Sequence, residues 1–175
     1  MMLMRIFDIL GKKSPANILM FFLENPDSEA KIKDVIKSTK LAKLSVLRWT
    51  KELAKYGILS RRTEGKMIFY TLNKRNSAVK QMKIFYNIDS INSKIGKLDD
   101  DVQIFIYGSF ARGEDGKKSD IDMLVIGKNR DIISKLKSVD TRIKVSFYTP
   151  VEWSMAARKD KAFFDNVEKD KIRIR

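Results

Sequence analysis

The most constraining feature of this sequence is a pair of short apolar runs, at residues 102–107 and 123–127, separated by a polar loop. Each run has the length and composition of a strand buried on both faces of a sheet. A Gly-Ser pair, Gly108 and Ser109, follows the first run, and the triplet Asp120-Ile121-Asp122 leads into the second. This order predicts two strands with a tight turn at the end of one and paired carboxylates on the other.

The residue types in this segment indicate phosphate and cation chemistry. A Gly-Ser turn at a strand end offers backbone N–H groups and a hydroxyl to a phosphate. Asp120 and Asp122 alternate along a strand, so their carboxylates project from one face with Cα atoms roughly 6–7 Å apart. Two such carboxylates repel each other unless a divalent cation lies between them. The layout is the one needed to hold Mg²⁺ and a nucleoside triphosphate (NTP).

Composition narrows the chemistry further. The chain has 175 residues with no His and no Cys, so imidazole acid–base catalysis, thiol nucleophiles, disulfides and zinc fingers are excluded. Carboxylate, hydroxyl, Lys and Arg chemistry remains, with Mg²⁺ as the natural metal.

The segment GSFARGEDGKKSDIDMLVIG resembles the signature of the DNA polymerase β-like nucleotidyltransferase superfamily: Gly-Ser, ten residues, then Asp-x-Asp. It is most similar to the minimal nucleotidyltransferases of archaea and bacteria. The resemblance implies that Ser109 contacts a terminal phosphate, Gly108 lets the backbone approach it, and Asp120 and Asp122 bind Mg²⁺ as the catalytic pair. Arg112 is a further candidate for binding the phosphates of the nucleotide, most simply ATP, although an ordinary surface Arg is an equal alternative.

The third strand departs from this resemblance. Active members of the superfamily carry a third carboxylate there, but the run 142–148 places Lys144 at that position, or Ser146 if the register slips by two residues. Lys144 would substitute in part for one cation and would leave no general base, a loss worth about 10²–10⁴-fold in rate. Glu152, which follows Thr149 and Pro150, is expected to cap the next helix rather than to replace the missing acid.

The N-terminal part reads as three helices and a hairpin. We expect a helix with Ser14 as N-cap that ends at Asn25, a second from near Ser28 to residues 38–40, and a third over 42–56. Strands at 58–62 and 67–72 follow, joined by a four-residue turn over 63–66. Residues 14–73 resemble winged helix-turn-helix regulators, in which the third helix enters the major groove and the hairpin contacts the DNA backbone.

The charge distribution favours DNA as the partner of this part. The net charge is +14, and residues 1–75 carry 16 Lys and Arg against 7 Asp and Glu, whereas residues 99–175 carry 16 against 14. A solvated basic face and a protein-binding module are the alternatives. The candidate DNA-binding residues are Lys40, Lys43, Ser45, Arg48, Lys51, Arg61, Arg62 and Lys66.

The predicted organisation is therefore an α+β protein with three parts. Residues 1–75 form a winged helix-turn-helix, 76–98 a linking helix or dimer seam, and 99–175 a nucleotidyltransferase domain with a mixed sheet and flanking helices. Its tail should be one helix over 151–171 and an edge strand over 172–175. Residues 1–10 should form a short packing or dimer-forming helix. No membrane or export signal is expected, which favours the cytoplasm. The apolar stripe of the linking helix is a candidate dimer seam, and we expect a homodimer.

Three functions fit these features. One is a DNA-associated nucleotidyltransferase that transfers a nucleotidyl group to a hydroxyl acceptor. Another is a winged-helix regulator whose catalytically weak or inactive nucleotidyltransferase domain senses a nucleotide or binds a partner. The resemblance adds a third, an antitoxin paired with a small helical HEPN-type toxin.

Overall fold

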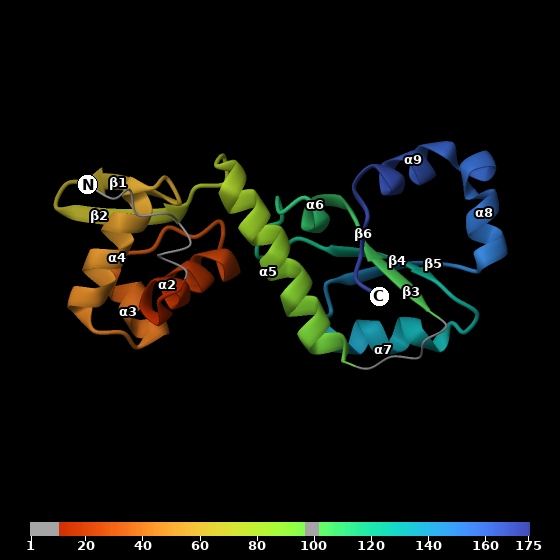
Figure 1. The fold of residues 1–175 in the computed structure, drawn as a ribbon, viewed down its shortest axis with the longest axis horizontal. Helices are drawn as coiled ribbons and strands as arrows, with labels where there is room; N and C mark the ends of the chain where they lie inside the picture. Colours follow the sequence, from red (N-terminus) through yellow and green to blue (C-terminus); the bar gives the residue numbers. More distant parts are fainter. Residues whose placement is uncertain (1–10, 97–101) are drawn as a thin grey trace. The chain divides into compact units, whose positions relative to one another are not determined.

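A computed structural model describes residues 11–96 and 102–175 of the chain (Figure 1). The helix predicted for residues 1–10 lies outside the described residues. By its contacts, the chain divides into two compact units, Met1–Lys80 and Gln81–Arg175. None of the helices within the described ranges combines the length and apolar character that crossing a bilayer requires.

Unit 1 contains three helices followed by an antiparallel hairpin. Its elements are α2 (Lys13–Glu24), α3 (Ile32–Thr39), α4 (Lys43–Lys55), β1 (Leu59–Glu64) and β2 (Met67–Leu72). The three helices pack against one another, and of these helices α2 and α4 pack together most extensively. The buried side chains at their centre are Ile18, Phe22, Val35, Val46, Trp49, Leu53 and Tyr70.

Two helix starts in unit 1 differ from the prediction. Helix α2 begins at Lys13 with Lys12 as N-cap, so Ser14 lies inside the first turn. Helix α3 begins at Ile32 instead of near Ser28. The preceding segment is extended because Ala30 and Tyr70 exchange two backbone hydrogen bonds of 2.9 Å, which a helix would have to break. Pairing with a distant strand therefore overrides local helix signals.

The third helix and the hairpin follow the prediction more closely. Helix α4 lies within one residue of the predicted bounds at each end, with Val46, Trp49 and Leu53 buried as expected. In the hairpin, β1 extends to Glu64, which pairs with Met67, so the turn is two residues long and not four. Gly65 adopts φ +57° in this turn, a conformation that favours glycine.

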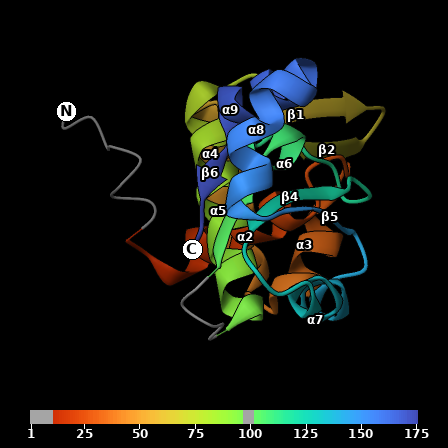
Figure 2. The same cartoon turned by 90° about the vertical axis from the view of Figure 1, so that its right-hand side faces the viewer.

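Unit 2 is built on a four-stranded mixed sheet in the order β5-β4-β3-β6. Strand β3 is antiparallel to β4 and β6, and β4 is parallel to β5. The elements are α5 (Ser77–Ile95), whose first residues belong to unit 1, β3 (Gln103–Ile106), α6 (Gly108–Ala111), β4 (Ile121–Ile126), α7 (Asp131–Val139), β5 (Ile143–Tyr148), α8 (Pro150–Lys159), α9 (Lys161–Asp170) and β6 (Ile172–Arg173). Figures 1 and 2 show α7 on one face of the sheet and α8 and α9 on the other.

Alternation along the strands gives this sheet two cores. Ile104, Ile106, Met123 and Val125 pack with residues of α5 and α7, including Ile91 of the predicted linking helix. The other face carries Phe105, Tyr107, Leu124 and Ile126, which pack with Val167 of α9 and Trp153 of α8. Even-numbered residues of β4 therefore face α9, and this parity determines where Asp122 points.

The C-terminal tail differs from the prediction in one respect. Residues 151–171 form two helices, α8 and α9, and not one, because the chain turns at Asp160 (φ −144°, ψ 75°). The Asp160 side chain caps α9 by accepting a hydrogen bond from the N–H of Phe163 at 3.0 Å. The final edge strand is confirmed as β6, antiparallel to β3.

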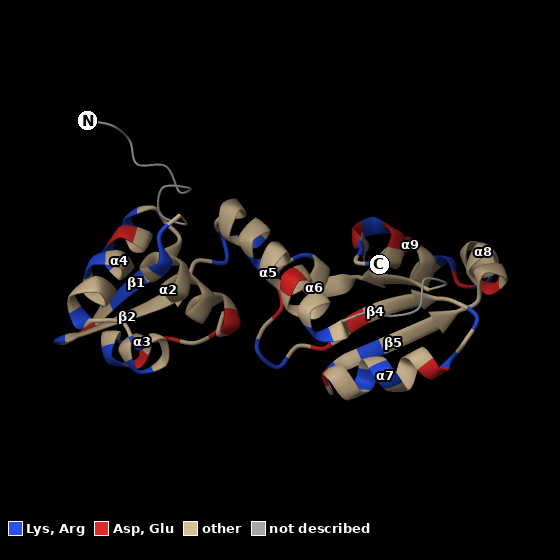
Figure 3. Ribbon diagram, turned by 60° about the horizontal axis from the view of Figure 1, so that its bottom comes forward, with Lys and Arg blue, Asp and Glu red and all other residues tan. Residues whose placement is uncertain are grey.

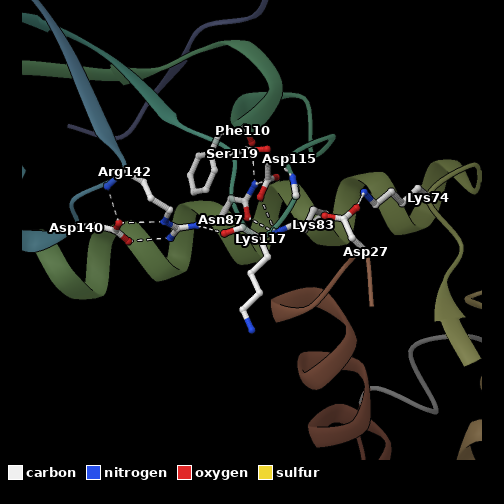
Figure 4. A network of polar contacts seen from close by, with 11 residues as sticks. Asp27, Lys74, Lys83, Asn87, Phe110, Asp115, Lys117, Ser119, Asp140 and Arg142 are labelled. Carbon is white, nitrogen blue, oxygen red and sulfur yellow. Dashed lines mark hydrogen bonds and ion pairs between the residues drawn. The ribbon is translucent and has the colours of Figure 1, made fainter. Parts of the chain in front are cut away.

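A buried polar network holds the 113–119 loop to α5 (Figure 4). Lys83 forms a 2.9 Å ion pair with Asp115, and both side chains are at most 6% exposed. Asn87 donates to Asp115 at 2.6 Å and to the carbonyl of Phe110 at 2.8 Å, and it accepts from Lys83 at 2.9 Å. From the other side, Arg142 donates to the carbonyl of Lys117 at 3.3 Å. The loop between the Gly-Ser turn and the aspartates is thus fixed at several points.

Replacing Asp115 with Ala should destabilise unit 2 strongly. The substitution removes the Asp115 carboxylate from the buried Lys83 ammonium, and breaking a buried ion pair costs about 3–5 kcal/mol in the free energy of unfolding. The double variant Lys83→Met/Asp115→Leu should recover most of this loss. Denaturant unfolding measures both, and Glu168→Ala, which breaks the more exposed ion pair with Lys171, should cost less than about 1 kcal/mol. Equal losses in the free energy of unfolding for Asp115→Ala and Glu168→Ala would show that the buried ion pair contributes no more to stability than the exposed one.

Candidate functional site

The two predicted carboxylates lie at the start of β4, on the face of the sheet that α9 covers. Ile121 and Met123 are fully buried in the opposite core, so the alternation directs Asp122 to the α9 face. Asp120 immediately precedes the strand and is exposed, whereas Asp122 is half-buried. Figure 3 shows acidic residues, in red, near the start of β4.

The Gly-Ser turn lies directly against Asp122. The N–H of Tyr107, at the end of β3, donates to the Asp122 carbonyl at 3.0 Å. The next residue, Gly108, has φ +70°, and a Cβ atom there would lie only 2.9 Å from Oδ2 of Asp122. Glycine is therefore required both by the backbone conformation and by the carboxylate beside it. Ser109 follows in α6, half-buried, and its carbonyl accepts from the N–H of Glu114 at 2.9 Å.

Strand β5 brings a positive charge to this pair. In the parallel register of β4 and β5, Lys144 is the partner of Asp122. Ser146, two residues further on, lies 3.2 Å from the hydroxyl of Tyr107, within hydrogen-bond distance. The strand position beside Asp122 thus carries an exposed Lys, and the register needs no slip to place it there.

The pKa of the Asp122 carboxyl is raised above its ordinary value, first by burial and then by the negative charges of Asp120 and Asp170. The positive charge of Lys144 opposes this effect. A cation bound between the carboxylates would relieve the same repulsion. The electrostatics of the site therefore favour a positive ligand.

Asp170 is a third acidic residue at this site, and sequence reasoning missed it. Its side chain is 10% exposed. One oxygen accepts from the N–H of Gly108 at 3.2 Å, and the other forms an ion pair with Arg112. The sequence pointed to this position only through the apolar alternation of residues 172–175, which predicts an edge strand. Pairing of that strand with β3 brings Asp170, just before it, to the Gly-Ser turn.

Comparison with known proteins supports the same reading of this unit. Residues 88–174 match the family model described as "Nucleotidyltransferase domain". Unit 2 contains a nucleotidyltransferase domain. The match begins within α5 and ends in the segment paired with β3, and the mixed sheet with flanking helices fits this fold. No curated protein matches the chain.

Nucleotidyltransferase domains generally use divalent metal ions. The side chains at this site provide some, but not all, of the ligands that such an ion needs. Asp120 and Asp122 provide oxygen ligands of the kind that Mg²⁺ prefers. Within residues 11–96 and 102–175, however, no group of three acidic side chains converges on a common metal position. The remaining ligands would have to be oxygens of a bound nucleotide or water.

Arg112, the candidate phosphate ligand, is engaged by carboxylates of its own domain. Its Nε donates to Glu114 at 2.9 Å, and its Nη1 pairs with Asp170. These hydrogen bonds, to Glu114 first and Asp170 second, raise the pKa of the guanidinium. Arg112 therefore lies at the Gly-Ser turn as expected, with its charge already offset.

The candidate DNA-binding residues all lie in unit 1: Lys40 directly follows α3, and the others lie on α4 and the hairpin. Figure 3 shows Lys and Arg positions of unit 1 in blue. Ser45 is half-buried and the others are exposed: Lys40, Lys43, Arg48, Lys51, Arg61, Arg62 and Lys66. Two of the Arg side chains have partners within the unit. The Arg48 guanidinium lies 5.0 Å from the centre of the Trp49 ring, and Arg62 forms 2.7 Å ion pairs with Glu29 and Glu64.

Gly108→Ala should disturb the site more than a matched change in the hairpin. At Gly65, with φ +57° and open space around it, Ala introduces only backbone strain of about 1–2 kcal/mol. At Gly108 the same strain is joined by contact with Asp122, so the free energy of unfolding should fall further. Denaturant titration of the two variants checks this, and an equal or smaller loss for Gly108→Ala would contradict the close approach.

Asp122→Asn should stabilise the protein at neutral pH when no divalent cation is present. Because the folded state raises the pKa of this carboxyl, ionised Asp122 weakens folding above that pKa, and a neutral side chain avoids the cost. The gain should disappear as the pH falls toward about 4, where the wild-type carboxyl takes up a proton. Thermal unfolding at pH 7.5 and pH 4 in EDTA measures this, with exposed Asp165→Asn as control. A less stable Asp122→Asn variant at pH 7.5 would refute the burial argument.

Proposed function

We propose that the nucleotidyltransferase domain binds an NTP with Mg²⁺ and transfers its nucleotidyl group to a hydroxyl acceptor, with pyrophosphate as the leaving group. The observation that carries the proposal is the close approach of the Gly-Ser turn to Asp122: a Cβ atom added at Gly108 would lie 2.9 Å from Asp122 Oδ2. Asp120 and Asp122 bind the cation, and Gly108, Ser109 and Arg112 bind phosphate oxygens. A bound divalent cation would supply charge neutralisation on the phosphates during in-line displacement.

The chain's own residues make this a slow enzyme in our proposal. Lys144 stands next to Asp122, where the resemblance implies a carboxylate, and an ammonium group cannot accept a proton from the attacking hydroxyl. Ser146, the alternative position, lies against Tyr107 and is no base at neutral pH. The chain has no His to take over. The domain therefore orients the nucleotide but activates the acceptor weakly.

Asp120→Ala should abolish Mg²⁺-dependent nucleotide binding and transfer. The substitution removes one of two carboxylates that hold the cation, and the overall fold should persist because the side chain is exposed. The test is calorimetry with Mg²⁺ and millimolar ATP, GTP, CTP or UTP, followed by incubation with labelled ATP and candidate acceptors. Transfer by the wild type no greater than that of Asp120→Ala would count against the proposal.

Lys144→Asp should increase transfer. The change supplies a carboxylate beside Asp122, and general base catalysis is worth about 10²–10⁴-fold. Lys135→Asp, at an exposed position of α7, makes the same change in net charge away from the site and should leave the rate unaltered. If the two variants transfer label equally slowly at saturating Mg²⁺, Lys144 is not the cause of the low rate.

A second candidate function is a DNA-binding regulator whose nucleotidyltransferase domain senses a nucleotide. Three helices followed by an antiparallel hairpin support a winged helix-turn-helix in unit 1. The exposed Lys residues of α4 support contact with DNA phosphates, which positions a protein on DNA without reading its sequence. Lys144 favours this candidate over a fast enzyme. Both functions use the same nucleotide site.

Lys43→Ala/Lys51→Ala should weaken binding to duplex DNA. Both side chains are exposed on α4, and removing two phosphate contacts should lower the slope of log K against log salt by about two. Fluorescence anisotropy over a salt series measures this. Lys135→Ala/Lys137→Ala, which removes two charges from α7 of unit 2, is the control. An equal loss in both double variants would indicate attraction by net charge alone.

A further inference from the structure

The carboxylate of Asp170 occupies the positive groups of the Gly-Ser turn. Its Oδ1 accepts the hydrogen bond of the Gly108 N–H at 3.2 Å, and its Oδ2 forms an ion pair with the Arg112 guanidinium. Both donors are groups that the proposed function assigns to a nucleotide phosphate. The Asp170 side chain is only 10% exposed, whereas the Arg112 side chain is 42% exposed, so the carboxylate is packed at the turn and its Arg partner lies partly in solvent.

The register of the sheet accounts for this position. Ile106 pairs with Ile172 and Phe105 with Arg173 in antiparallel β3 and β6. Continuing the same register by two residues places Gly108 opposite Asp170, the last residue of α9. A backbone pairing at the sheet edge thus brings the acid to the turn.

Two features of the local environment disfavour a negative charge at the position of Asp170. An acidic residue at the C-terminus of a helix is disfavoured by the helix dipole. Asp170 also adds a negative charge near Asp122, which already experiences repulsion from the negative charge of Asp120. Two contacts offset these costs: the hydrogen bond from the Gly108 N–H and the ion pair with Arg112. Asp170 and the Gly-Ser turn therefore stabilise each other.

We propose that Asp170 is an internal anion in the phosphate position of the nucleotide site, and that it lowers the affinity of the domain for nucleotides. This inference rests on the proposed function. A phosphate can contact Gly108 and Arg112 only after the Asp170 side chain has turned away, because one N–H cannot serve two acceptors well. The apparent dissociation constant is therefore the intrinsic one divided by the fraction of molecules in which this position is free.

The test is calorimetric titration of the full chain with ATP and Mg²⁺, and separately with inorganic pyrophosphate and Mg²⁺. Asp170→Asn keeps the size of the side chain and removes its charge. It should bind both probes about tenfold or more tightly than the wild type, because the competing anion is gone. Asp165→Asn, an exposed acid on the same helix, removes the same charge and should change each dissociation constant by less than about twofold.

The other outcomes overturn the inference in distinguishable ways. Weaker binding by Asp170→Asn would mean that Asp170 helps to hold the cation instead of competing with the phosphate. Unchanged binding, with a wild type that does bind, would refute the competition and leave the proposed function intact. Binding of neither probe by either protein would refute both.

A second measurement does not depend on the folding of a variant. In the ¹⁵N-labelled wild type, the Gly108 amide resonance should shift during titration with ATP and Mg²⁺, since phosphate replaces the carboxylate as its acceptor. A Gly108 resonance that stays in place at saturation would overturn the proposal.

Discussion

The site depends on the hydrogen-bond register of four short strands. Antiparallel β3 and β4 place Tyr107 beside Asp122, parallel β4 and β5 place Lys144 beside Asp122, and β3 with β6 brings Asp170 to Gly108. Because side chains alternate along a strand, a slip of one residue in any pairing would turn a charged group into the opposite core. The apolar residues on both faces of the sheet therefore also fix the positions of the polar ones.

This arrangement produces a site whose charges are largely matched within the chain. Lys144 opposes the repulsion between the aspartates, and Asp170 together with Glu114 offsets Arg112. A ligand that carries both signs, such as a cation with a polyphosphate, can replace these internal partners group by group. A domain of this kind binds weakly and reacts slowly in our account, which suits a sensor as well as an enzyme. The two proposed functions therefore differ in rate and partner more than in the chemistry of the site.

Local patterns in the sequence predicted many of the helices and strands and the central residues of the candidate site. The order of strand, Gly-Ser turn and Asp-x-Asp predicted that Gly108 follows one strand and that Asp122 lies on another, and α4 was predicted to within one residue at each end. The errors came from interactions between distant segments: pairing with Tyr70 keeps Ala30 extended, and the turn at Asp160 splits the tail into two helices. Asp170 and the buried Lys83–Asp115 pair were missed for the same reason. A single charged residue carries no pattern until its partner's position is known.

The most direct test of this nucleotide site is to soak a crystal of the full chain with Mg²⁺ and a non-hydrolysable NTP analogue and to determine the structure. We predict a cation between Asp120 and Asp122, a phosphate oxygen at the Gly108 N–H, and the Lys144 ammonium beside the aspartates. Electron density for the triphosphate elsewhere on the chain, or none near the Gly-Ser turn at saturating ligand, would contradict it.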